Sequence, residues 1–127
     1  MEYGYKRRVN TSYEETITRT KEELQNEGFG ILTEIDVKAT LKKKLDVDFD
    51  NYIVLGACNP PFAYQALQAE KDIGLLLPCN VIVYESDGTT YVSAIAPTVA
   101  MNMVENPGLE NIAVEVEEKL KRVIDSI

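Results

Sequence analysis

Histidine and tryptophan are both absent from the 127 residues of this chain. Without histidine there is no Ser-His-Asp or Cys-His nucleophile, no zinc site with imidazole ligands, and no common general base at neutral pH. Long apolar runs are also absent, since no segment approaches the roughly 20 residues that span a bilayer. Residues 1–8 lack the apolar core of a secretory signal. We therefore expect a cytoplasmic protein, with no membrane partner and with catalysis uncertain and disfavoured.

Positively charged residues are outnumbered by negatively charged ones, 13 to 21, which gives a net charge of −8. Nucleic-acid binding needs a cationic surface that neutralises phosphates, so we expect no nucleic-acid partner. No Gly-x-Gly-x-x-Gly or P-loop pattern follows an apolar run, which removes the usual nucleotide sites and leaves no cofactor to expect. Apolar residues make up 45% of the chain, and no linker or repeat interrupts it. We expect a single domain over residues 1–127.

Only two cysteines are present, Cys58 and Cys79, and each is followed by asparagine. Each lies where an apolar segment meets a proline, which places both at candidate ends of β-strands. Their spacing matches neither a CxxC redox motif nor half of a four-cysteine zinc site. The simplest interpretation is that both are small, reduced, buried side chains.

The hydrophobic periodicity alternates between strands and helices. Helices are expected over Tyr13 to Glu27, Val37 to Leu45 and Pro60 to Glu70, capped by Ser12, Asp36 and Asn59. Pro97 to Met103 predicts a short helical turn, and Leu109 to Asp125 predicts the clearest amphipathic helix. Strands are expected over Tyr3 to Val9, Phe29 to Ile35, Tyr52 to Ala57, Leu76 to Glu85 and Thr90 to Ile95. In the second strand, Phe29, Ile31, Thr33 and Ile35 are expected to share one face.

The turn at Asp87 and Gly88 predicts a tight hairpin, so at least one strand pair is antiparallel. The predicted fold class is therefore α+β rather than a doubly wound parallel sheet.

Three segments resemble the domain-of-unknown-function family three hundred and two. They are Glu27 to Lys38, Leu55 to Pro60, and Leu76 to Val81 with Tyr84 and Glu85. The resemblance spans nearly the whole chain. It implies a β-α-β4-α fold of the TATA-binding-protein-like class, in which a curved, mostly antiparallel sheet packs against a long C-terminal helix, with short helical insertions. It also implies homodimers and no settled activity. Family members vary the residues that are here Cys58 and Cys79.

Three functional hypotheses follow. The first is a homodimeric, non-catalytic module that binds a small molecule or a protein at a cleft shaped by Asp36, Cys58, Asn59, Pro60, Pro78, Cys79 and Asn80. The alternative is a thiol site for redox chemistry, sulfur transfer or a soft metal such as zinc, if antiparallel strands bring Cys58 and Cys79 together. A position before a helix N-terminus predicts a modestly lowered pKa for Cys58.

The third hypothesis is acid–base chemistry or hard-cation binding by Glu34 and Asp36, which share one face of a strand. Metal candidates are therefore Cys58, Cys79, Glu34 and Asp36. The plainer interpretation is that Asn59 and Asp36 cap helices and that Pro60 and Pro78 end strands.

Overall fold

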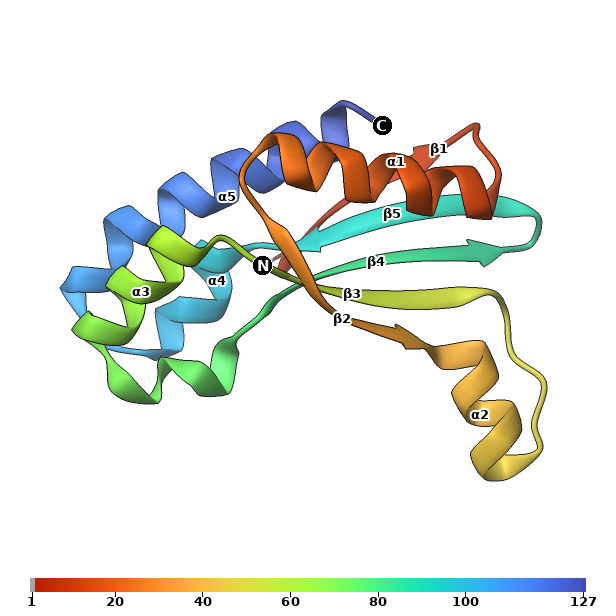
Figure 1. Ribbon diagram of the computed structural model, residues 1–127, viewed down its shortest axis with the longest axis horizontal. Coiled ribbons are helices and arrows are strands. Elements are labelled where there is room, and N and C mark those ends of the chain that lie inside the picture. Colours follow the sequence, from red (N-terminus) through yellow and green to blue (C-terminus); the bar gives the residue numbers. More distant parts are fainter. Residues whose placement is uncertain (1) are drawn as a thin grey trace.

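A computed structural model describes residues 2–127 (Figure 1). The five strands are β1 (Gly4–Val9), β2 (Gly30–Asp36), β3 (Tyr52–Cys58), β4 (Cys79–Ser86) and β5 (Thr89–Ile95). The α-helices are α1 (Tyr13–Asn26), α2 (Val37–Leu45), α3 (Pro60–Ala69), α4 (Pro97–Ala100) and α5 (Glu110–Asp125). Short 3₁₀ helices are η1 (Lys71–Leu76), η2 (Met101–Met103) and η3 (Pro107–Leu109). The predicted β-α-β4-α order with helical insertions is confirmed.

The strands form one sheet in the order β1-β5-β4-β3-β2, and every neighbouring pair is antiparallel. One face of the curved sheet is covered by α1 and α5, which lie on the same side (Figure 1). On this covered face, Leu55, Val83 and Val92 are fully buried against the helices. The covered face therefore holds the main hydrophobic core.

The opposite face of the sheet has no helix layer over its centre (Figure 1). A cross-strand row of stacked tyrosines runs over it, with ring centroids 5.4 Å apart for Tyr52 and Tyr84 and 5.2 Å apart for Tyr84 and Tyr91. Val54 and Ile82 pair in the neighbouring row and are only partly buried. We call this surface, defined by Tyr52, Val54, Ile82, Tyr84 and Tyr91, the open face.

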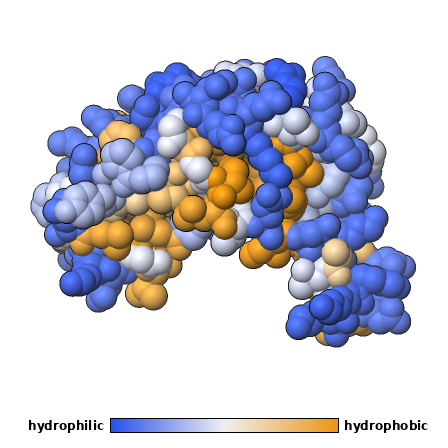
Figure 2. Space-filling view, in the orientation of Figure 1, coloured by the Kyte–Doolittle hydropathy of each residue, from blue (hydrophilic) through white to orange (hydrophobic). Residues whose placement is uncertain are grey.

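Helix α2 projects away from the sheet at the end of β2 and buries none of its residues (Figure 1). Asp36 caps it as predicted, because its Oδ1 accepts a hydrogen bond of 2.9 Å from the Ala39 amide. A recess separates this arm from the body of the molecule, and apolar side chains gather along the adjoining lower edge (Figure 2). The arm therefore has little contact with the core.

At the opposite end of the sheet, α3, η1 and α4 pack beside the first half of α5 (Figure 1). A second, smaller core forms there from Ala66, Ile73, Met101, Leu109 and Ala113. None of the helices within residues 2–127 is long and apolar enough to cross a membrane.

Two local predictions are wrong. A bulge between Ile31 and Thr33 leaves Leu32 without a partner in β3, so Ile31 lies on the covered face while Thr33 and Ile35 lie on the open face. The four residues from Phe29 to Ile35 therefore do not share one face. The fourth strand begins at Cys79 rather than Leu76, because the preceding residues form η1 and the Leu77–Pro78 segment.

Candidate functional site

Four of the seven predicted ligand-binding residues meet around one apolar cavity. The cavity lies past the end of β3 and the start of β4, has a volume of about 30 Å³, and we call it the sheet-end cavity. Cys58, Asn59, Pro78 and Cys79 line it. Its remaining walls come from the segments just before β2 and β4, from β3, and from the helices α3, α4, η2 and α5. The residues are Phe29, Ala57, Phe62, Ala63, Ala66, Leu77, Pro97, Met101, Ile112, Ala113 and Val116.

The two cysteines are neighbours but not a directly opposed pair. Strands β3 and β4 run antiparallel, so the end of one meets the start of the other, and Cys79 lies opposite Ala57. Cys58 follows Ala57 in the strand, and side chains alternate between faces, so the strand register directs the two thiols to opposite faces. Both remain free thiols, and both line the cavity, which lies beyond this last pair.

Burial disfavours the thiolate form at both positions. It raises the pKa of the Cys79 thiol to about 11, with a smaller contribution from the charge of Cys58. Burial also raises the pKa of Cys58 above its ordinary value. The predicted lowering at Cys58 is therefore wrong: desolvation outweighs the helix N-terminus, whose first two residues are prolines without N–H groups. At neutral pH both side chains are uncharged.

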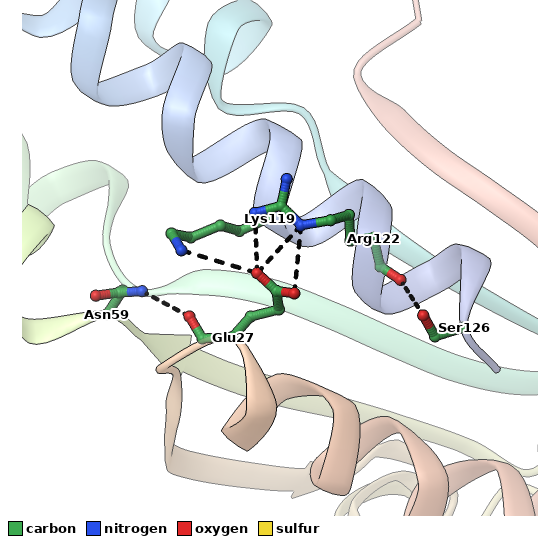
Figure 3. A network of polar contacts seen from close by, with 5 residues as sticks. All are labelled: Glu27, Asn59, Lys119, Arg122 and Ser126. Carbon is green, nitrogen blue, oxygen red and sulfur yellow. Dashed lines mark hydrogen bonds and ion pairs between the residues drawn. The ribbon is translucent and has the colours of Figure 1, made fainter.

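Asn59 closes the cavity from the side of α1. It occupies the backbone N-cap position of α3, but its side chain makes no cap hydrogen bond. Its Nδ2 instead donates a 3.1 Å hydrogen bond to the Glu27 carbonyl at the end of α1 (Figure 3). The amide also lies close to Gly28, where a Cβ atom would approach it to 3.3 Å. Pro61, at the second helical position, has no N–H group to donate a hydrogen bond to a capping side chain. The Asn59 side chain is therefore free to make this tertiary contact.

The carboxylate of Glu27 ties the same turn to α5. Arg122 Nη2 donates to Glu27 Oε1 at 3.0 Å, and Lys119 Nζ lies 3.8 Å from the same oxygen (Figure 3). The hydrogen bond from Arg122 holds the pKa of Glu27 below its ordinary value. Glu27 and Asn59 therefore join α1, the β3–α3 junction and α5 around the cavity. Sequence reasoning missed Glu27, whose position just before a helix-ending glycine was the one available signal.

Three other predicted residues do not line the cavity. Pro60 is the exposed first residue of α3, and Asn80 is exposed in β4 opposite Gly56. Asp36 lies at the far end of β2, opposite Ile53, where it caps α2. Pro78 both lines the cavity and covers Gly56, where a Cβ atom would lie 2.9 Å from the Pro78 Cγ and would collide with the Thr33 hydroxyl. Gly56 is thus required by close packing rather than by backbone freedom.

Glu34 and Asp36 do share one side of β2, because they pair with Leu55 and Ile53. Glu34 forms an ion pair of 2.9 Å with Lys21 of α1. Their β3 partners Leu55 and Ile53 precede Cys58 by three and five residues, so the four candidate metal ligands fall into two separate groups. Within residues 2–127, no three histidine, cysteine, aspartate or glutamate side chains cluster closely enough to hold a metal ion.

A larger recess of about 520 Å³ lies beside the sheet-end cavity, and we call it the tip groove. It runs between η2, η3 and the start of α5. The lining residues are Thr98, Met101, Asn102, Val104, Glu105, Asn106, Pro107, Leu109, Glu110, Ala113 and Val114. The sequence marks only the break at Asn106 to Gly108, so the groove itself was not predicted.

These features define a class: an α+β protein with an antiparallel sheet covered on one face, and a small apolar cavity where two central strands end. The chain belongs to the family Domain of unknown function DUF302, whose model matches residues 5–127. A crystal structure of an uncharacterized conserved DUF302 protein from Bacillus stearothermophilus is similar, with 35% sequence identity, a TM-score of 0.93 and 98% coverage of both chains. None of the curated proteins matches this chain.

Proposed function

We propose that this protein is a single-domain, cytoplasmic, non-catalytic binding module that works as a homodimer and takes the apolar part of a small organic molecule into the sheet-end cavity. One observation carries the proposal: Cys58, Asn59, Pro78 and Cys79 line one apolar cavity although they come from two chain segments. Ligand sites are concave, mostly apolar and equipped with few polar groups. The cavity of about 30 Å³ holds only a few atoms, so a ligand widens it on entry.

The open face supports the dimeric part of this proposal. Partly buried aliphatic and aromatic side chains lie on it without a covering helix, and Lys6 lies 5.0 Å from the centre of the Tyr91 ring. Aromatic side chains are enriched at protein interfaces. The exposed Val47 and Phe49, on the connector after α2, extend the apolar surface toward the arm. A second copy of this chain is the occupant that we assign to the open face.

The binding proposal is tested with 1-octanol as an apolar probe, followed by NMR chemical-shift changes. We expect chemical-shift changes at Ala57, Phe62 and Ala66. The variant Ala63→Leu should bind 1-octanol more weakly, because the larger side chain narrows the cavity. Ala39→Leu is the matched control, because Ala39 is exposed on α2. Shifts confined to the open face, or equal binding by Ala63→Leu and wild type, would overturn the proposal.

A thiol site is the second candidate, supported by the presence of both cysteines along one cavity. The raised pKa values of Cys58 and Cys79 count against a reactive thiolate at neutral pH. Mass spectrometry after alkylation of the reduced protein separates the candidates. Fast labelling of either cysteine at pH 7 favours the thiol site, and labelling only after unfolding favours the binding module.

A further inference from the structure

The sheet-end cavity and the tip groove share two lining residues, Met101 and Ala113. Met101 comes from η2 and Ala113 from α5, and both belong to the smaller core. The two spaces are therefore neighbours divided by one thin wall. On one side of this wall lies the apolar cavity of about 30 Å³, and on the other side lies a groove of about 520 Å³ that opens to solvent.

The wall is built from side chains that can open. Methionine is unbranched with three rotatable bonds, so it adapts its shape at low cost. Ala113 contributes only a methyl group, so Met101 supplies most of the barrier. Rotation of Met101 toward solvent would join the groove to the cavity. The joined space has an apolar inner end and a mouth between η2, η3 and α5.

The mouth of the tip groove has a defined charge. Among residues 2–127, its lining includes two carboxylates, Glu105 and Glu110, and no lysine or arginine. Its other polar groups are largely satisfied by internal hydrogen bonds. Thr98 donates to Glu117 at 2.7 Å, and Asn106 donates to the Ala69 carbonyl at 2.9 Å.

Asn102, Glu105 and Glu110 are exposed at this mouth, and none of their side chains makes a hydrogen bond or ion pair within the described residues. The groups that remain available to a ligand are thus one amide and two carboxylates. The complementary head group is a cation that donates hydrogen bonds. The groove floor of Val104, Leu109 and Met101 is apolar and suits a hydrocarbon chain.

We propose that the joined space binds an amphiphile with an unbranched apolar tail and a cationic amine head, with the tail passing Met101 into the sheet-end cavity and the head held by Glu105 and Glu110. This inference rests on the proposed binding function and adds the ligand class. The two carboxylates repel an anionic head, and a neutral head gains no attraction from them.

Three probes with the same chain separate the parts of this proposal: octylammonium, 1-octanol and octanoate. We expect octylammonium to bind at least about threefold more tightly than 1-octanol, in line with a surface charge interaction, and octanoate to bind more weakly than both. The preference for octylammonium should shrink as the salt concentration is raised from about 10 to about 500 mM, because salt screens the attraction between the ammonium group and the carboxylates. Dissociation constants come from NMR titration of the full chain.

The variant Glu105→Gln with Glu110→Gln should abolish the preference for octylammonium and leave the affinity for 1-octanol unchanged. Both residues are exposed, so the variant should fold normally. Glu14→Gln with Glu22→Gln, on the exposed side of α1, is the matched control and should retain the preference. Ala113→Leu should thicken the wall and weaken all three probes, whereas Met101→Ala should strengthen them without changing their order.

The outcomes distinguish the two proposals. If 1-octanol causes no shifts at the cavity, the proposed function fails, and this inference fails with it. If 1-octanol binds at the cavity but octylammonium binds no more tightly, or the preference survives the double glutamine variant, the ligand class is wrong and the binding function stands. Shifts of Val104 and Leu109 together with Phe62 are expected for octylammonium; shifts at the groove alone would disprove passage through the wall.

Discussion

The two faces of the sheet are formed by the same strands and both carry apolar residues, yet they have different surroundings. On the covered face, Leu55 and Val83 are excluded from solvent by α1 and α5. On the open face, Val54 and Ile82 are their immediate neighbours in the same strands and are only partly buried. The difference shows that apolar residues on both faces mark a strand as central but do not tell which face forms the core of the monomer.

The largest expected effect tests the covered face. Leu55→Ala removes a fully buried side chain and leaves a cavity under the helices, which should lower the free energy of unfolding by about 3 kcal/mol. Urea denaturation followed by circular dichroism measures the change. Leu45→Ala is the control, because Leu45 is 66% exposed at the end of α2 and should cost far less. Equal losses would contradict the division between the two regions.

A smaller loss is expected at a crowded point of the open face. Gly56→Ala brings a Cβ atom against the Thr33 hydroxyl and to 2.9 Å from the Pro78 Cγ. Such overpacking should cost about 2 kcal/mol of unfolding free energy. Adding Thr33→Ala should recover part of this loss in the same denaturation experiment. Gly74→Ala has no heavy atom within 4 Å of its new Cβ and serves as the control; a similar loss there would show that close packing is not the cause.

The open face itself is tested by a charge. If a second copy covers this face as proposed, Ile82→Lys should weaken dimerisation at least tenfold, about 1.4 kcal/mol, because a lysine at the centre of the proposed interface must lose its water. Sedimentation-velocity centrifugation over a range of concentrations measures the dissociation constant. Leu75→Lys introduces the same charge at an 88% exposed site in η1 and should leave it unchanged. If the wild-type protein is already monomeric, the proposal that a second copy covers the open face is wrong.

The smallest effect concerns the ion pair above the covered face. The pKa of Glu27 is lowered by its hydrogen bond from Arg122, so the folded state binds the proton less readily than the unfolded state. This contribution is present above the ordinary pKa of 4.5 and is lost as pH falls through the folded-state value. Glu27→Gln should cost less than about 1 kcal/mol at pH 7.

Thermal melting at several pH values checks the sign of that effect. The difference between wild type and Glu27→Gln should shrink as the solution is acidified and should be nearly gone once the carboxyl of Glu27 is protonated. Glu22→Gln is the control, because Glu22 is exposed on α1 and belongs to none of the ion pairs within residues 2–127. A difference that grows toward low pH would contradict the assigned cause.

Much of the fold follows from local sequence signals. Ser12 caps α1, Asp36 caps α2, and the turn at Asp87 and Gly88 joins β4 to β5, as predicted. Homodimers and the likeness to the TATA-binding-protein-like class remain predictions. These signals succeed because a cap or a tight turn depends on a few consecutive residues.

The candidate site was less predictable because it depends on packing between distant segments. The helix-start position of Asn59 is visible in the sequence, but its bond to the Glu27 carbonyl requires the end of α1 to lie beside the β3–α3 junction. The groove beside Met101 likewise exists only where η2 meets α5. The raised pKa of Cys79 depends on burial, which the spacing of two cysteines does not reveal.

The bulge at Leu32 has a consequence for how the gene can change in length. Deleting the codon for Leu32 would remove the bulge and leave Ile31 opposite Ala57 and Thr33 opposite Gly56, so the rest of β2 would keep its present faces. The ion pair of Glu34 with Lys21 and the cap of α2 by Asp36 would both be retained. Insertions and deletions within residues 46–50, which form an exposed connector, also leave the strand register unchanged. We expect length variation among relatives to accumulate in that connector and, within β2, to be confined to the position of Leu32.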